Sequence, residues 1–234
     1  MARNLFCNQG MMVRFLQAAR KEKMHKLNFD GFEIKVLSTM EAIRKRPTMY
    51  VGILEDPKLF TKLIIEAMCL SRARAVDGQV TDIIVSLTDN NEVTISDNGC
   101  GMSMEPHIKY LSGAFGDKSL LEKLLTELHA CKNIKHDDIQ SFCENGIVVV
   151  NALSEYFSVT NKINNLAYII RYVEGELEKS PYISHPVTHE GLVFNFKFDP
   201  KIFGELKVDR KHLIAEIEKI KIATPINIEL VFDN

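Results

Sequence analysis

The stretch that decides the fold is VTISDNGCGM, residues 93–102, where an alternating strand pattern runs into an acid and two glycines. Apolar residues alternate with threonine and serine, which predicts a strand with one buried face. Asp97 would end that strand, and Gly99 and Gly101 permit backbone angles and close approaches that other residues do not. A carboxylate there can accept a hydrogen bond from a purine amino group. The same letters also suit an ordinary turn, because Asp-Asn-Gly is a common turn sequence.

Composition restricts the class of protein. The 234 residues are 46% hydrophobic and carry 29 Lys and Arg against 31 Asp and Glu, a net charge of -2. Such a chain can bury a sizeable core, and its balanced charge gives no overall footprint for nucleic acid. No apolar run reaches membrane-spanning length and no signal sequence is recognisable, so we expect a cytoplasmic protein without membrane contact. The five cysteines form no CxxC pair, and the sequence predicts no metal site.

A second stretch places an acid on the apolar face of a helix. Asp-Pro at residues 56–57 predicts a helix start, and leucine and alanine side chains then form one stripe over residues 59–70. Glu66 lies on that stripe. Because a buried acid is unfavourable unless it is paired or functional, two roles remain open. Glu66 is either satisfied by Arg44 or Arg46, or it serves as a catalytic base.

The rest of the chain mixes helical and strand patterns, and residues 131–145 are polar and aperiodic, as a mobile lid or an ordinary surface loop would be. Helices interspersed with hairpin-linked strands indicate an α+β sandwich, with helices on one face of a mixed sheet. The valines of residues 146–154 locally favour a strand. Strands are predicted at residues 83–87, 92–96, 156–160, 167–173, 192–198 and 226–232, and helices at residues 5–24, 38–46, 57–77, 120–128 and 213–220.

The run EAIRKRPTMYVG, residues 41–52, resembles the opening of the N-terminal ATPase domain of bacterial type IIA DNA topoisomerases, the domain found in the B subunits of gyrase and topoisomerase IV. Several matched blocks in one order are stronger support than a single motif. The resemblance implies the GHKL, or Bergerat, ATP-binding fold, in which residues 146–154 would form a buried helix. A histidine kinase domain shares this fold but lacks the first block. The resemblance covers about residues 33–233, and further matched blocks are residues 97–101, 128–130 and 149–154.

The resemblance also implies roles for individual residues. Asp97 would bind the adenine amino group. Gly99 and Gly101 would shape the floor of the adenine pocket, and Met102 would line it. Glu66 would be the base that activates water for attack on the γ-phosphate, a role that a positioned carboxylate can fill.

The departures from the family lie mainly at the phosphates. Where an Asn would ligate magnesium, this chain has Leu70, which cannot coordinate a hard cation. The acidic positions that follow are also lost, one of them to Arg74. Of the glycine-rich turn whose amides wrap the phosphates, only Gly146 remains, and Glu144 adds a negative charge. At the adenine end, a Gly-Thr pair that contacts the adenine-binding Asp appears as Gly-Leu, residues 191–192. ATP is thus the implied cofactor, and magnesium lacks its expected ligand.

From the resemblance we expect an N-terminal amphipathic arm, residues 1–30, and a GHKL-type nucleotide-binding domain, residues 31–234, without a transducer or metal-binding cleavage domain. The arm would either pack on its own domain or support a homodimer. The expected ligand is an adenine nucleotide, and DNA or a gyrase-A-like subunit would be partners only within a larger assembly. Two hypotheses remain: an ATP-binding domain of a gyrase-B-like subunit with weakened or lost hydrolysis, or a non-catalytic module that acts through protein contacts.

Overall fold

The structure is a computed structural model that describes residues 27–29, 32–34, 36–105, 118–130, 144–183, 186–224 and 226–233. The chain divides into two compact units, Met1–Ser38 and Thr39–Asn234. In the first unit, β1 (Leu27–Phe29) and β2 (Phe32–Ile34) form an antiparallel pair. The helix predicted for residues 5–24 and most of the loop or lid at residues 131–145 lie outside the described residues.

The second unit is built on a seven-stranded mixed sheet with the strand order β7-β6-β5-β8-β4-β3-β9. Neighbouring strands are antiparallel, except that β9 runs parallel to β3. The strands are β3 (Asp82–Thr88), β4 (Glu92–Asp97), β5 (Ser154–Ile163), β6 (Leu166–Val173), β7 (Glu176–Ile183), β8 (Gly191–Phe198) and β9 (Asn227–Asp233).

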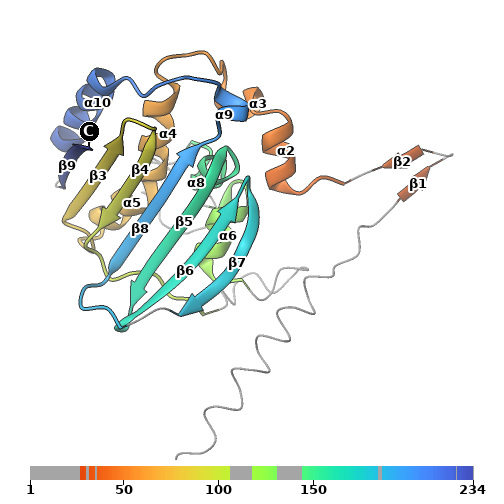
Figure 1. The fold of residues 1–234 in the computed structure, drawn as a ribbon. Coiled ribbons are helices and arrows are strands. Elements are labelled where there is room, and N and C mark those ends of the chain that lie inside the picture. The colour runs from red at the N-terminus through yellow and green to blue at the C-terminus, as the bar shows by residue number, and fades with distance from the viewer. Residues whose placement is uncertain are drawn as a thin grey trace, which may run out of the picture. The chain divides into compact units, whose positions relative to one another are not determined.

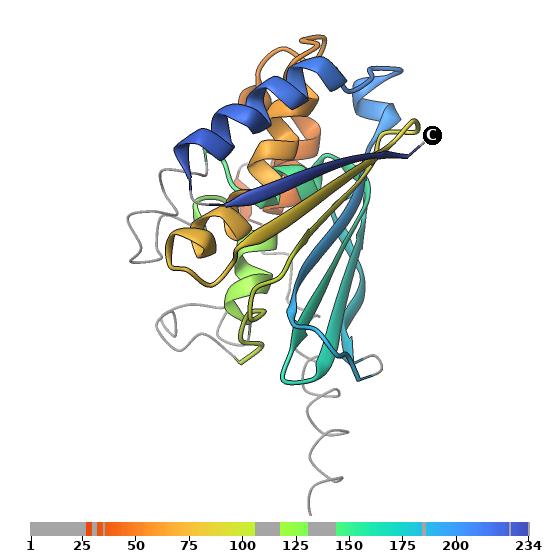
Figure 2. The ribbon, with the colours of Figure 1, turned by 90° about the vertical axis from the view of Figure 1, so that its left-hand side faces the viewer.

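Helices cover one face of this sheet, as the two views in Figure 1 and Figure 2 show. This two-layer arrangement confirms the predicted α+β sandwich. No helix in the described part of the chain combines the length and the hydropathy that a membrane span requires. The helices are α2 (Thr39–Lys45), α3 (Thr48–Val51), α4 (Leu59–Ala67), α5 (Cys69–Val76), α6 (Leu120–Thr126), α8 (Ile147–Ala152), α9 (Pro200–Phe203) and α10 (Arg210–Ala223).

The core lies between the sheet and the helices. In β4, Val93 and Ile95 are buried while Thr94 between them is only half-buried, as the alternating pattern predicts. In β8 the buried positions include three phenylalanines, and the ring of Phe198 stacks on that of Phe60 from α4 with 4.3 Å between centroids. Burial of these large apolar side chains is the main favourable contribution to folding, and it fixes α4 against the sheet.

Helix α8 shows where the local pattern misleads. Its valine run favours a strand, yet all of its residues are buried in a helix that packs against α2, α4 and α6. A helix with neighbours on every side is apolar all round, so the valines that suggested a strand are explained by burial. The buried helix implied by the family resemblance is therefore confirmed.

Two other predictions are wrong in detail. The sequence predicts no strand at β7, whose residues ELEKSPYI are charged and include a proline. Such residues are disfavoured in central strands but tolerated at the edge of a sheet, where β7 lies. The helix predicted for residues 57–77 is two helices, α4 and α5, which meet at Met68. Asp56 accepts the backbone N–H of Lys58 at 2.9 Å, which caps the turn that precedes α4.

Candidate functional site

Asp97, the acid at the end of β4, has a completely buried side chain, with 0% exposed. Its Oδ1 accepts the backbone N–H groups of Gly99 at 3.0 Å and Leu192 at 3.1 Å. Its Oδ2 accepts the hydroxyl of Ser71 at 2.6 Å and Nη1 of Arg74 at 3.3 Å. A carboxylate offers about four lone-pair positions, two on each oxygen. Donors of the chain itself therefore fill the acceptor capacity of Asp97.

Two glycines near Asp97 lie where other atoms of the chain leave no room for a side chain. Gly101 has a φ of +70°, and a Cβ there would lie 2.5 Å from the carbonyl oxygen of Lys162. A Cβ at Gly191 would lie 2.1 Å from the carbonyl oxygen of Asp97 itself. Both positions therefore require glycine. The close approaches expected near Gly101 do occur, but in this structure the approaching atoms belong to the protein.

Met102, the predicted lining residue, is held through its backbone. The carboxamide of Asn161 in β5 accepts the Met102 N–H at 2.9 Å and donates to the Met102 carbonyl at 2.6 Å. This pair of hydrogen bonds fixes the segment after β4 against β5, while the Met102 side chain packs against the core. No motif in the sequence marks Asn161, although a fully buried polar residue in a strand needs partners.

Glu66 lies near the end of α4 and faces the segment that leads into α8. Its carboxylate accepts the backbone N–H groups of Glu144, Asn145 and Gly146 at 3.2, 3.0 and 2.5 Å. Gly146 is the residue before α8 and has a φ of 90°. The first N–H groups of a helix have no partner within it, and a negative charge there is favourable. Glu66 therefore binds and caps the entry to α8.

The ion pair considered from the sequence is replaced by these backbone hydrogen bonds. Arg44 instead donates to the carbonyl oxygen of Ala152 at 2.7 Å and to the carboxylate of Asp199. It also lies 3.7 Å from a carboxylate oxygen of Glu174. Arg44 thus joins α2 to the end of α8, to the end of β8 and to the β6–β7 turn. The suggested ion pair between Arg44 and Glu66 is therefore wrong.

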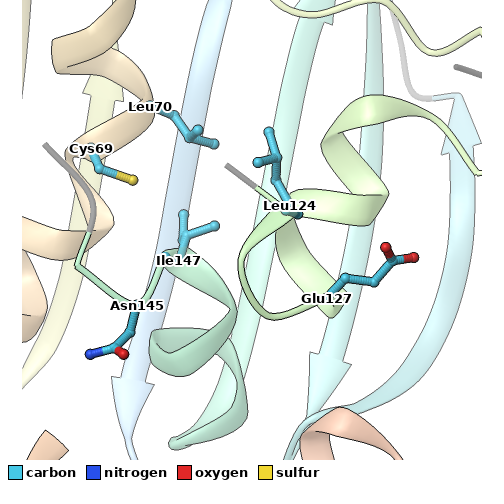
Figure 3. Close-up of a pocket in the computed structure, with 8 residues that line it drawn as sticks. Cys69, Leu70, Leu124, Glu127, Asn145 and Ile147 are labelled. Carbon is cyan, nitrogen blue, oxygen red and sulfur yellow. The ribbon is translucent and has the colours of Figure 1, made fainter. Parts of the chain in front are cut away.

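A small pocket lies beside Gly146, and Figure 3 shows the side chains that line it. Leu70, Leu124 and Ile147 point into the same space from α5, α6 and α8, while the carboxylate of Glu127 points away. The pocket volume is about 10 Å³, which is room for roughly one water molecule. The lining residues are Cys69, Leu70, Leu124, Glu127, Ala130, Asn145, Gly146 and Ile147.

Leu70, at the position where the resemblance places the magnesium ligand, does not fit a magnesium ion. Leu70 is only 3% exposed and has no oxygen to offer. In the described ranges, no group of three or more His, Cys, Asp or Glu is arranged to hold a metal. No chemical step through a bound metal can therefore be derived from this chain.

The predicted site residues form two groups. At the end of β4, Asp97 and Gly99 lie with Ser71 and Arg74 of α5. At the start of α8, Gly146 lies with Glu66 of α4. Ser71 and Arg74 are three positions apart, on one helix face, but that spacing alone does not identify the strand end they meet.

The sheet, its single layer of helices and the acid followed by glycines at the end of β4 are compatible with the GHKL ATP-binding fold. The chain's homologues are the B subunits of bacterial topoisomerases, which confirms the resemblance seen in the sequence. The chain is 33% identical over 215 residues to the B subunit of DNA topoisomerase 4 from Rickettsia prowazekii (strain Madrid E), which is 88% of this chain and 31% of that protein.

Two further relatives agree with the first. The B subunit of DNA topoisomerase 4 from Mycoplasma genitalium is 31% identical over 202 residues, 83% of this chain and 30% of the relative. The B subunit of DNA gyrase from Rickettsia typhi is 35% identical over 193 residues, 81% of this chain and 23% of the relative. The matched region thus spans between 23% and 31% of the length of these relatives. No protein-family model matches the chain.

Proposed function

We propose that this chain is a nucleotide-binding domain of the gyrase-B type that binds adenine nucleotides weakly and does not hydrolyse ATP at an appreciable rate. The observation that carries the proposal is the apolar filling beside Gly146, where Leu70, Leu124 and Ile147 leave about 10 Å³. By resemblance, this is the place for a metal ion and the triphosphate. Phosphoryl transfer depends mainly on positioning the phosphates and neutralising their charge, and apolar side chains such as Leu70 can do neither.

Glu66 supports the same conclusion. By resemblance, the amides of the segment before α8 wrap the phosphates. In this chain three of those amides, of residues 144–146, are hydrogen-bonded to the Glu66 carboxylate. A triphosphate would have to displace one anion and approach a second at Glu144, and like charges at close range repel. Glu66 retains a possible role as base, but a positioned base alone supplies about 10²- to 10⁴-fold.

A steady-state ATPase assay with Mg²⁺ tests this proposal, with the N-terminal ATPase domain of a gyrase run in parallel. We expect turnover at background level and no change in Glu66→Gln. Calorimetry should show weak binding of adenine nucleotides that does not depend on Mg²⁺. Turnover comparable to the gyrase domain, abolished by Glu66→Gln, would overturn the proposal.

Leu70→Asn sharpens this test because it introduces an oxygen ligand at the position in question. We expect Mg²⁺-dependent nucleotide affinity to rise more than turnover, since Glu66 still holds the amides before α8. Leu124→Asn is the matched control, because it introduces the same polar group into the same pocket from α6. If the two variants behave alike, the position of Leu70 has no special meaning for metal binding.

The wider context is also proposed from the relatives. Their names describe subunits of DNA topoisomerases, so we propose that this domain works in the cytoplasm within a gyrase-B-like assembly, with DNA and a gyrase-A-like subunit for partners. We also propose that the arm, residues 1–30, supports a homodimer. Sedimentation of the whole chain and of an arm-deleted chain tests this, and identical monomeric behaviour of both with nucleotide present would contradict it.

One observation favours the second candidate, a non-catalytic module that acts through protein contacts. Arg74 is hydrogen-bonded to the carboxylate expected to recognise adenine. If calorimetry detects no nucleotide binding at any accessible concentration, this second function replaces the first.

A further inference from the structure

Arg74 on α5 is a buried cation at the expected base-recognition site. Only 10% of its side chain is exposed, and its Nη1 lies 3.3 Å from Oδ2 of Asp97. Its Nη2 lies over Gly99, where an added Cβ would be 2.3 Å away from it. Within the described residues, Nε and Nη2 are buried without a hydrogen-bond partner. The guanidinium is therefore held on one side only, by Asp97.

The hydrogen bonds of Asp97 show what this cation displaces. Three of its donors, the N–H groups of Gly99 and Leu192 and the Ser71 hydroxyl, come from the backbone or from a short side chain. Arg74 is the fourth donor and completes the acceptor capacity of about four positions. An exocyclic amino group needs one free position on the carboxylate. Arg74 is the donor with the longest side chain, and within the described ranges its Nε and Nη2 have no other hydrogen-bond partner, so it is the one that can move away.

We propose that Arg74 is a specificity-determining residue: it occupies the position on Asp97 that the amino group of adenine would use, and it thereby lowers the affinity for adenine nucleotides. The inference rests on the proposed nucleotide site at Asp97. The family resemblance places an acid at this helix position, and an acid would not donate to Asp97. With an acid at position 74, the carboxylate of Asp97 would be open to a ligand. With Arg74, the chain itself neutralises that carboxylate.

Removal of the guanidinium is expected to destabilise the fold less than removal of Asp97 does. Asp97 keeps three donors without Arg74. The buried Nε and Nη2 are unfavourable as they stand, because unpaired buried donors lose their hydration without compensation. Arg74→Met retains most of the aliphatic side chain and carries neither the charge nor the donors.

The test measures ATP and GTP affinity by calorimetry for the wild-type chain and for Arg74→Met. We expect ATP to bind about ten- to a hundredfold more tightly to the variant, the gain from one charge-assisted hydrogen bond. GTP should gain less, because its 6-oxo group cannot donate to Asp97. If the only effect of the substitution were the loss of a positive charge, the affinity for both ATP and GTP would fall. The direction of the change in affinity therefore separates the two explanations.

Two further variants complete the test. Arg72→Met, the same change two residues away on α5, should leave ATP affinity unchanged. Asp97→Ala combined with Arg74→Met should remove the gain. An Arg74→Met chain that binds ATP no better than wild type, or a gain that survives without Asp97, would overturn the inference.

Folding of each variant is checked by denaturation. If Arg74→Met does not fold, Arg74→Gln takes its place with the same expected direction and a smaller gain, and absence of that gain overturns the inference. The outcome is separate from that of the proposed function, because loss of hydrolysis is measured as turnover and does not require that ATP binds more tightly to any variant.

Discussion

Asp97 and Glu66 are two carboxylates that both accept hydrogen bonds from the chain itself, yet they are held differently. Asp97 is fully buried and meets a side-chain cation, a hydroxyl and two amides. Glu66 is half-buried and meets only backbone amides. At the base end of the expected site, one charged residue neutralises the carboxylate. At the phosphate end, apolar side chains fill the space and a carboxylate takes the amides.

Under the proposed function, the two ends of the nucleotide site are weakened in physically distinct ways. A side chain such as Arg74 can be exchanged by a single substitution, so the base end is expected to be recoverable. At the phosphate end three helices contribute Leu70, Leu124 and Ile147, so a single substitution leaves two of these apolar side chains in place. The following predictions test how firmly each carboxylate is held.

The largest effect is expected for Asp97→Ala. It removes the partner of a buried guanidinium, and breaking a buried ion pair from one side costs about 3–5 kcal/mol of unfolding free energy. Denaturant unfolding measures this. In the Arg74→Met background the same change should cost less, because no buried cation is left without a partner. Equal costs in the two backgrounds would show that the Asp97 and Arg74 side chains are not coupled.

A smaller effect is expected for Glu66→Ala. Hydrogen bonds to a charged group contribute about 1.5–3 kcal/mol, and here they join α4 to the start of α8. Hydrogen exchange should accelerate at the amides of residues 144–146 more than in β4. Glu66→Gln is the matched control, because its carbonyl oxygen can still accept from two of the three amides. Unchanged exchange in the Ala variant would contradict the capping role.

The smallest effect is expected for Asp82, a partly exposed carboxylate at the start of β3. Hydrogen bonds from the Thr81 hydroxyl, then from Asn227 and Asn98, hold the pKa of Asp82 below its ordinary value of 3.8. Because the folded pKa is lowered, ionised Asp82 stabilises the fold above the ordinary value, and that contribution disappears as the pH falls through the folded pKa.

Wild type and Asp82→Asn, unfolded with denaturant at several pH values, provide the measurement. The wild type should be slightly more stable at neutral pH, and the difference should shrink toward pH 3. A difference that does not change with pH would mean that the charge of Asp82 contributes nothing. Comparison with the result for Asp97→Ala would show how much burial adds to the contribution of a carboxylate to the unfolding free energy.

Much of the fold is predictable because burial leaves a periodic pattern. Val93 and Ile95 alternate in β4 as the letters indicate, and the hairpin of β3 and β4 follows from it. Helix α8 is not predictable in this way, since a helix buried on every side has no periodicity. Its assignment came only from the resemblance to a known family.

The site is less predictable, for a different reason. The acid on the apolar stripe correctly marks Glu66 as a residue that needs partners. Its partners are backbone amides 78 to 80 residues away in the sequence. Because every residue except proline has a backbone N–H, the residue type does not show which amides are available to Glu66. The hydrogen bond between Arg74 and Asp97 likewise depends on where α5 packs against β4, which the letters of either segment do not state.

The edge strand β7 has a consequence for aggregation. An exposed sheet edge can template pairing with another chain through its free N–H and C=O groups. In β7, Glu178 carries a charge that is paired with Arg171 of β6. Charged side chains at an edge are one of the features by which sheets avoid such growth. Extension of the sheet by a second molecule is therefore disfavoured at β7, which protects a concentrated solution of this domain against fibrous assembly from that side.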